Sequence, residues 1–357
     1  MTALTQNDRN LTTSGSIAVA NLNAQIDGLT GRLPGARSPQ AATALLTAVD
    51  TTPLIDVLLL RGQVLGRIAD YERAVGLAEA LVRDAPTDGA AWLARARTQA
   101  TLHRFAQGLA DLDTAGRWAV DPAAREAERA AILQAVGCHA EALVLRRTAV
   151  QRRPDFTTVG ALAVLQAERG QITEAERLFN EARHRYRGVS PFPIADLDFR
   201  RGLMWQGRGH LRAARLWFDA VVRRVPAHAP ALGHLAAVDA ALGAPGSAIG
   251  RVRPLAVTSD DPDYAATLAS VLRTAGRPRE AEQWRVIAAA RYHELVARHP
   301  EAFAHHAADF WLTVGDDRSE GLRLLELDRA SRSAAMVTER ARLALGGPPV
   351  PSRGSVA

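Results

Sequence analysis

The sequence predicts an all-α protein in which helix hairpins repeat in tandem and stack into a solenoid. Three recurring marks support this fold class: a small residue that returns every 33 to 40 positions, a glycine five residues before it, and a proline about twelve residues after it. Hairpins of this kind bury their apolar faces only against their neighbours, so a fixed period along the chain is the expected signature of a solenoid.

The small residue marks the point where the two helices of one hairpin must approach closely. Its successive separations are 33, 34, 34, 33, 39, 34, 33 and 40 residues. The two long steps have visible causes, namely a loop expected at 188–193 and a helix lengthened through Arg291–Glu294. The small residues are Ala41, Ala74, Gly108, Ala142, Ala175, Ala214, Ala248, Ala281 and Gly321.

The glycine and the proline have separate mechanical roles. A glycine tolerates the left-handed conformation that ends the first helix of a hairpin. A proline cannot continue a helix, so it ends the second helix and turns the chain into the next unit. The glycines are Gly137, Gly170, Gly209, Gly243 and Gly276; the prolines are Pro53, Pro86, Pro154 and Pro226, with Pro122 and Pro262 two residues later.

Between these marks the spacing of apolar residues is helical. In Val57–Arg67 and in Ala90–Leu102, apolar residues recur three and four positions apart, which is the period of an α-helix. Few segments alternate with period two, so we expect no strands.

The residues at these marks resemble the tetratricopeptide repeat (TPR) pattern of a Trp, then Leu-Gly and an aromatic, followed by Ala, Phe and Pro. The resemblance implies a right-handed α-solenoid, with about seven repeats over 55–331. The matching residues are Trp92, Gly62 and Gly202 in first helices, Tyr71 and Phe105 three positions before the small residue, and the pairs Ala175 with Phe179 and Ala214 with Phe218.

The ends of the chain depart from the pattern. Residues 1–20 are polar and expected to be disordered, and 21–54 form a degenerate first repeat because Gly28 and Gly31 disfavour helix. Residues 332–345 are expected to form a C-terminal capping helix over the last repeat. The tail 346–357, rich in Pro and Gly, is expected to be disordered.

Composition excludes several classes of function. All 44 positive charges are arginine, and the formal net charge of +6 is small for 357 residues, so nucleic acid is disfavoured as a partner. Cys138 is the one cysteine, which rules out an intramolecular disulfide and a cysteine metal cluster. The sequence has no apolar run of membrane-spanning length and no secretory signal. We therefore expect a cytoplasmic protein without a membrane partner.

The resemblance implies a concave groove, lined by the first helix of each hairpin, that binds a peptide or helical segment of a partner protein. Small residues at Ala127, Ala131, Gly160, Gly233 and Ala237 would form an open floor. The absence of lysine disfavours partners whose C-terminal carboxylates are clamped by lysines. The groove residues implied are Gln63, Arg67, Arg97, Thr101, Gln134, Glu168, Phe199, Gln206, Arg273, His305 and Asp309.

Arginine clusters leave a second reading open. Arg152-Arg153, Arg183 to Arg187 and Arg223-Arg224 fall at the ends of second helices. Cations there are favoured by the helix dipole and can bond free carbonyls, which explains them without a ligand. The alternative is a regulatory module that contacts an anionic partner, an acidic protein or nucleic acid, through an arginine-rich edge.

Catalytic chemistry is the least supported reading. The histidines His293, His299, His305 and His306 do not have the spacing of a metal site. Cys138 precedes His139 directly, and neighbours in a turn seldom form a catalytic pair. We find no phosphate loop, serine elbow or paired-carboxylate motif, and expect a non-enzymatic scaffold without cofactor or metal.

Overall fold

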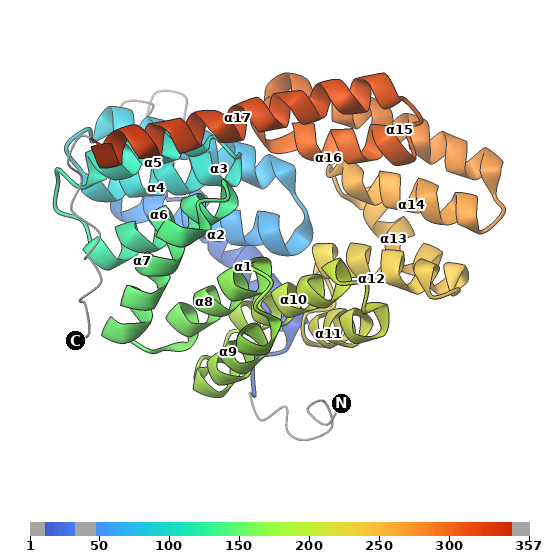
Figure 1. The fold of residues 1–357 in the computed structure, drawn as a ribbon, viewed down its shortest axis with the longest axis horizontal. Helices are drawn as coiled ribbons and strands as arrows, with labels where there is room; N and C mark the ends of the chain where they lie inside the picture. The colour runs from blue at the N-terminus through green and yellow to red at the C-terminus, as the bar shows by residue number, and fades with distance from the viewer. Residues whose placement is uncertain (1–10, 33–47, 345–357) are drawn as a thin grey trace, which may run out of the picture.

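The structure, a computed structural model, describes residues 11–32 and 48–344, and within these ranges every regular element is an α-helix (Figure 1). A first helix, α1 (Gly15–Thr30), is followed by eight hairpins. The hairpins are α2 (Ala48–Leu65) with α3 (Ile68–Asp84), α4 (Gly89–Thr101) with α5 (Phe105–Ala115), α6 (Pro122–Ala135) with α7 (His139–Arg152), α8 (Phe156–Glu168) with α9 (Ile172–Arg185), α10 (Phe192–Gly207) with α11 (Leu211–Arg224), α12 (Ala229–Ala241) with α13 (Pro245–Thr258), α14 (Pro262–Thr274) with α15 (Pro278–Arg298), and α16 (Pro300–Thr313) with α17 (Arg318–Ala344).

The small residue of each described hairpin lies buried on its second helix. Ala74, Ala142, Ala175, Ala214 and Ala248 have no exposed surface. A larger side chain there would push the helices apart, so these positions set the distance between the two helices of a hairpin.

The turn inside each hairpin depends on a left-handed residue. The five glycines expected in this role, including Gly137 and Gly276, all have φ between +72° and +85°. In two hairpins without the glycine, His103 and Asp316 take the same conformation, with φ of 55° and 56°. His103 and Asp316 lie five residues before Gly108 and Gly321, which is the position that glycine has in the other repeats. The left-handed turn is therefore kept in hairpins that lack this glycine.

Aspartates begin several first helices. Asp88, Asp121, Asp155 and Asp261 each accept a hydrogen bond from a backbone N–H in the first turn of the following helix. Such caps satisfy donors that have no partner inside the helix. Prolines follow at the first position of α6 and α14, where a missing N–H costs nothing.

The solenoid coils far enough for its beginning to pack on its later repeats. One apolar cluster contains Leu22, Leu58 and Leu81 of α1, α2 and α3, together with Phe192 of α10 and Leu235 of α12. Figure 1 shows α1 and α2 in the middle of the molecule, surrounded by later hairpins. The chain therefore fills much of its own concave side.

A polar seam closes the coil between α3 and the last hairpins. The Asp260 carboxylate accepts hydrogen bonds from the backbone N–H groups of Ile68 and Ala69, at 2.8 Å each, and so caps α3 from a distant repeat. Glu72 accepts from Arg298 and from His299 Nε2, which lies 2.8 Å away. These contacts join residues about 190 or more positions apart and hold the two ends of the array together.

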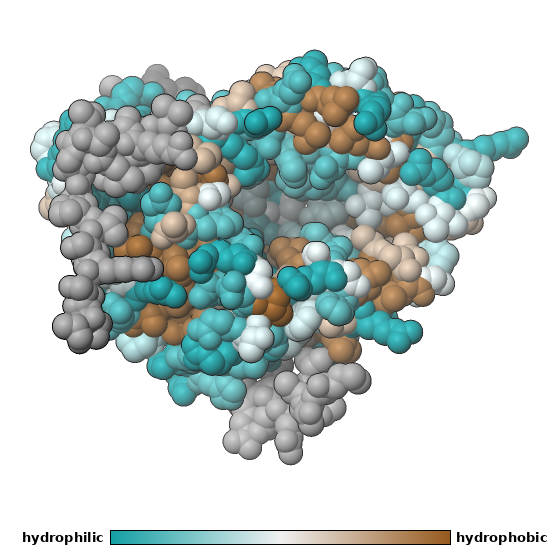
Figure 2. Space-filling view, viewed as in Figure 1, coloured by the Kyte–Doolittle hydropathy of each residue, from teal (hydrophilic) through white to brown (hydrophobic). Residues whose placement is uncertain are grey.

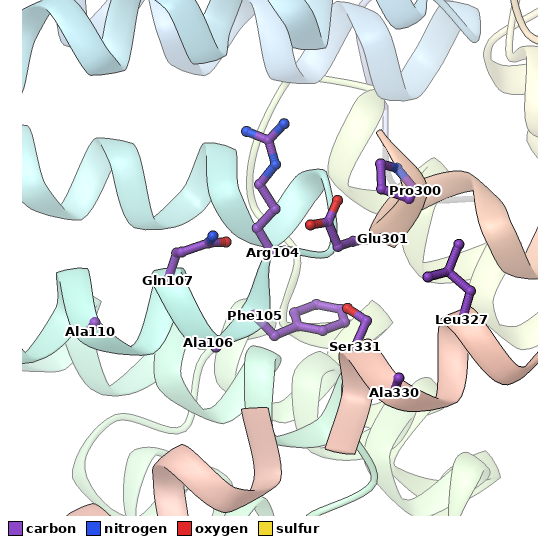
Figure 3. A pocket seen from close by; sticks show the side chains of 10 residues that line it. All are labelled: Arg104, Phe105, Ala106, Gln107, Ala110, Pro300, Glu301, Leu327, Ala330 and Ser331. Carbon is purple, nitrogen blue, oxygen red and sulfur yellow. The ribbon is translucent and has the colours of Figure 1, made fainter. Parts of the chain in front are cut away.

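The long helix α17 extends this closure. It crosses from the last hairpin to α5 (Figure 1), and Arg332 donates to the Ala135 carbonyl at 2.8 Å. A cavity of about 550 Å³ remains where α5 faces α16 and α17. Figure 3 shows Phe105 on one side of it and Pro300, Glu301 and Leu327 on the other.

Two boundaries differ from the sequence-based expectation at the chain ends. Residues 15–20, expected to be disordered, form the first turns of α1, because Ala18 and Leu22 pack into the common core. The predicted capping helix 332–345 is, as far as residue 344, the second half of α17, since no Gly or Pro interrupts the chain between Leu322 and Ala344. It packs on α5 rather than standing alone over the last repeat.

Other differences lie inside the array. The loop expected at 188–193 ends at Pro191, because Phe192 and Pro193 already belong to α10, where a proline fits the first turn. Pro53 lies within α2 and ends no helix. From α2 to α17 the described residues form eight hairpins. The small residue Ala41, and the expected disorder of 346–357, fall outside the described residues.

No helix in the described ranges is at once long and apolar enough to span a bilayer.

The buried small residues give a direct test of the register. We expect Ala175→Arg to lower the free energy of unfolding by about 3 kcal/mol, because it combines overpacking with a buried charge. Thr173→Arg, at an exposed position of the same helix, is the matched control and should have little effect. Thermal and urea unfolding measure both; equal loss in the two variants would show that the register is misplaced.

The seam gives a test of closure. Glu72→Gln removes the charge that holds Arg298 and His299, so we expect a larger radius of gyration by small-angle X-ray scattering than for the wild type, and a difference that shrinks as ionic strength rises because salt weakens the wild-type pairs. Glu79→Gln, on an exposed position of the same helix, should leave the dimensions unchanged. Identical scattering from Glu72→Gln and the wild type at all salt concentrations would contradict a polar seam.

Candidate functional site

A groove on the concave face of the last four hairpins is the candidate site. Its volume is about 660 Å³, and helices α10, α12, α14 and α16, the first helices of consecutive hairpins, form most of its wall. The space-filling view is hollowed between α16 and α12 (Figure 2). We call this the C-terminal groove; the residues that line it include Gln206, Gly233, His234, Ala237, Asp261, Asp263, Tyr264, Ala266, Thr267, Tyr292, His306, Asp309 and Phe310.

Small residues keep the groove open. Gly233, Ala237 and Ala266 line it from α12 and α14. A Cβ atom at Gly233 would lie 3.0 Å from the Tyr264 ring, so the glycine lets α14 approach α12 closely. The small side chains of Ala237 and Ala266 leave the floor of the groove open.

A hydrogen-bonded trio forms one wall. Asp263, at the start of α14, accepts from the Tyr292 hydroxyl, and its other oxygen lies 3.1 Å from His306 Nδ1. The negative charge of Asp263 raises the pKa of His306 to about 9. The loss of solvation alone would raise the pKa of Asp263, but the His306 charge and hydrogen bonds from His306 and Tyr292 lower it. Both groups are thus charged at neutral pH and neutralise each other.

Asp261 has a different environment two residues earlier. Its Oδ1 accepts from the Asp263 backbone N–H at 2.9 Å and caps α14. Poor solvation and the nearby Asp263 charge raise its pKa to about 7. Unlike Asp263, this carboxyl has no cation bonded to it.

His234 contributes a hydrogen-bond acceptor. Its Nδ1 lies 2.8 Å from the Gln206 amide oxygen, and burial lowers its pKa, so the ring is neutral with the proton on Nδ1. Nε2 is then left as an acceptor.

Two of the groove residues expected from the sequence, Gln206 and Asp309, line the C-terminal groove. Three others are engaged by the chain itself. Gln63 donates to Asp196 of α10 at 2.9 Å, and Arg97 pairs with Glu128 and Asp56. Phe199 is buried against Phe218 and the rings of two histidines. The Gln63 contact follows from the closure of the coil, whereas Arg97 bonds to the adjacent helices α2 and α6, and Phe199 packs on α11 and α12.

The remaining expected residues lie outside the C-terminal groove. Arg67 is exposed near Asp70, the Thr101 hydroxyl donates to a carbonyl of its own helix, and Gln134 is half-buried. Glu168 lies 4.0 Å from His139. Arg273 borders a separate cleft beside Arg285 and Asp316, and His305 lies between Asp309 and Asp328.

Sequence reasoning missed four groove residues whose pKa values are shifted, Asp261, Asp263, His306 and Tyr292. A signal existed for the first two, since Asp260-Asp261-Pro262-Asp263 is a helix start at the phase of a first helix. In the sequence, His306 belongs to a run of histidines whose spacing indicates no metal site. Tyr292 comes from the lengthened part of α15, which the period could not align.

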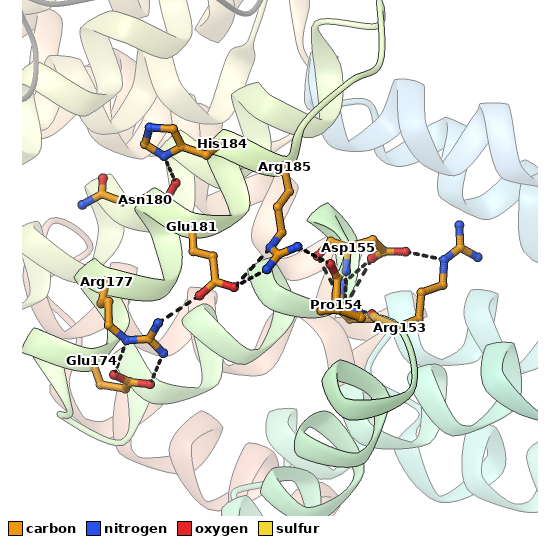
Figure 4. A network of polar contacts seen from close by, with 10 residues as sticks. Arg153, Pro154, Asp155, Glu174, Arg177, Asn180, Glu181, His184 and Arg185 are labelled. Atoms are coloured by element: carbon orange, nitrogen blue, oxygen red, sulfur yellow. Dashed lines mark hydrogen bonds and ion pairs between the residues drawn. The ribbon is translucent and has the colours of Figure 1, made fainter.

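The arginines of these clusters bond to other groups of the protein. Figure 4 shows Arg185 bonded to Glu181 and to the Pro154 carbonyl, and Arg153 bonded to Asp155. Arg152 pairs with Glu126, Arg183 with Asp198, and Arg223 with Asp219. Their place at helix ends and on carbonyls is the one expected from helix chemistry.

The histidine-rich segment is spread over the C-terminal hairpins. His293 stacks near Trp311, His299 belongs to the seam and His306 to the groove. Within the described residues no group of three or more His, Cys, Asp or Glu side chains is arranged to hold a metal ion. Cys138 is half-buried between two apolar clusters.

The His306–Asp263 pair predicts a pH dependence. Because the folded-state pKa of His306 is raised from 6.5 to about 9, its stabilisation is complete below about pH 6.5 and is lost as pH rises through about 9. The pair is half-exposed, so we expect a contribution of only about 1 kcal/mol. The stability difference between wild type and His306→Asn in urea should shrink from pH 7 to pH 10. His305→Asn is the control; an unchanged difference for His306→Asn would contradict the pair.

Comparisons with known proteins place the fold. No protein-family model matches the sequence, and no curated protein sequence matches it. The Cut9–Hcn1 hetero-tetramer of APC/C matches with TM-score 0.54 and 13% identity over 95% of this chain and 61% of that chain. The human IFIT1 dimer with PPP-AAAA matches with TM-score 0.50 and 13% identity over 91% of this chain and 86% of that one.

A tetratricopeptide repeat protein from Parabacteroides merdae aligns with 77% of this chain and 98% of its own, at TM-score 0.44 and 13% identity. At these identities the similarities concern the fold alone. The buried small residues and left-handed turns keep the phase of that repeat from α3 to α17. The chain therefore has the fold of a tetratricopeptide repeat protein.

Proposed function

We propose that the protein is a non-enzymatic scaffold that binds a segment of a partner protein in the C-terminal groove. The observation that carries the proposal is that the groove is continuous over the first helices of four consecutive hairpins. Helices α1 and α2 pack against α10 and α12 and cover the adjoining part of the concave face.

The lining suits an extended or helical segment. Gly233, Ala237 and Ala266 leave room for a backbone, while Gln206, Thr267 and Asp309 offer hydrogen bonds along its edges. A mostly small and apolar floor with a few polar groups is the usual composition of a peptide groove. In the wall, Asp263, His306 and Tyr292 bond to one another.

The alternative, an anionic partner on the arginine-rich edge, has less support. A phosphate or nucleic acid site needs cations that are free to bind, and the edge arginines bond to carboxylates and carbonyls of the chain. No arginine lines the C-terminal groove. The human IFIT1 structure contains PPP-AAAA, but a groove walled by Asp261, Asp263 and Asp309 would repel such a ligand.

Blocking the groove tests the proposal. Ala237 is exposed on the floor, so Ala237→Trp should fill the groove without disturbing the core. We would select a phage-displayed random peptide library on the wild type, and we expect enriched peptides to lose at least tenfold in affinity for Ala237→Trp by calorimetry.

Ala131→Trp is the matched control, since Ala131 is an exposed alanine at the expected groove position of α6, outside the C-terminal groove. It should bind the same peptides as the wild type. Equal binding by Ala237→Trp, or loss of binding only in Ala131→Trp, would overturn the assignment. Unfolding curves of both variants establish that they are folded.

A further inference from the structure

We infer that the turn between α2 and α3 shapes the C-terminal groove from across the seam, so that binding in the groove and closure of the coil favour each other. The inference rests on the proposed function and adds how binding at that site is regulated. It follows from one short segment, 259–264, whose first residues bond across the seam and whose last residues line the groove.

The first residues of this segment hold the α2–α3 turn. Ser259 is buried where α13 ends, and its hydroxyl donates to the Gly66 carbonyl at 2.6 Å. Asp260 accepts from the backbone N–H groups of Ile68 and Ala69 at the start of α3. A buried carbonyl that loses its donor is unfavourable, so these bonds fix the turn to the segment while the coil is closed.

Tyr264, the last residue of the segment, touches both the groove and the turn. It lines the groove, and its side chain is only 5% exposed. A Cβ atom at Gly233, on the groove side, would lie 3.0 Å from Cε1 of the ring. A Cβ atom at Gly66, in the turn, would lie 2.8 Å from Cε2 and 2.6 Å from the hydroxyl oxygen. The ring is therefore packed at one edge by α12 and at the other by the α2–α3 turn.

This packing holds the wall of the groove in one shape only while the coil is closed. If the seam opened, Ser259 and Asp260 would lose their partners, and the Tyr264 ring would lose its neighbour at Gly66. The start of α14 could then shift against α12. A ligand that fits the closed shape binds the closed coil more tightly, and by linkage it favours closure by the same factor.

Other bonds hold the segment independently of the seam. Arg291 of α15 donates to the Ser259 carbonyl at 3.2 Å, and the Tyr292 hydroxyl donates to Asp263. Both bonds join the segment to α15, which follows it in the chain, and neither involves α2 or α3. Opening of the seam is therefore expected to change the shape of the groove without unfolding α14.

Two seam residues test the coupling because they lie outside the lining of the groove. Glu72→Gln removes a charge that holds Arg298, and Asp260→Asn removes the charge and one of the two oxygens that cap α3. For groove-dependent peptides, those lost with Ala237→Trp, we expect the two exchanges together to lower affinity by about fivefold or more in calorimetry.

The matched control makes the same two exchanges away from the seam. Glu79 is exposed on α3, and Asp121 caps α6. Asparagine caps a helix about as well as aspartate, so Glu79→Gln with Asp121→Asn should bind the peptides as the wild type does. Unfolding curves of both double variants establish that they are folded.

A second readout separates coupling from the loss of a direct contact with the ligand. We expect the seam double variant alone to have a larger radius of gyration than the wild type by small-angle X-ray scattering. Saturating peptide should bring its dimensions back toward the wild-type value, because the ligand favours the closed coil. A residue that acted only by touching the peptide would not change the dimensions of the unbound protein.

The outcomes separate this inference from the proposed function. Wild-type affinity in a seam variant whose coil has opened would overturn the inference and leave the proposed function standing. So would a loss of affinity without any change in dimensions, or dimensions and affinity that both stay at wild-type values. Failure to recover any peptide that depends on Ala237 would overturn the proposed function and this inference together.

Discussion

The close contact of two helices at a buried alanine is the interaction on which the rest of this structure depends. Where Ala142, Ala175 or Ala214 lies, the second helix of a hairpin can approach the first without a gap, and the left-handed turn before it sets the angle of return. Each hairpin then offers the same apolar edge to the next. The persistence of the turn at His103 and Asp316 shows that the packing demands the conformation even without glycine.

Closure of the coil follows from that geometry and decides what the concave face can do. Once the hairpins have turned far enough, α3 meets the last repeats, and Asp260 and Glu72 bond to groups 192 and 227 positions away. The helices α1 and α2 then cover the middle of the face. The C-terminal groove lies beside this covered part, and its chemistry is set by residues of four consecutive hairpins.

Arginine side chains also hold neighbouring helices together. The pairs Arg61 with Asp70, Arg95 with Asp111 and Arg201 with Glu176 join neighbouring helices by two-pronged hydrogen bonds. The planar guanidinium suits such bonds better than an ammonium group does. The arginine-rich composition thus strengthens the stacking, and the acidic C-terminal groove, without arginine in its lining, is distinct from the rest of the chain.

The sequence by itself determined the helical hairpins, their phase and the turns between them, because these depend on residues close together in the chain, such as Gly170 and Ala175. Of the site it indicated Gln206, Asp309 and the floor at Gly233 and Ala237. Only the tertiary structure decided that Phe199 is buried, that 332–345 continues α17, and that Tyr292, Asp263 and His306 form one wall. These facts depend on small rotations that accumulate from hairpin to hairpin, and the local pattern does not encode their sum.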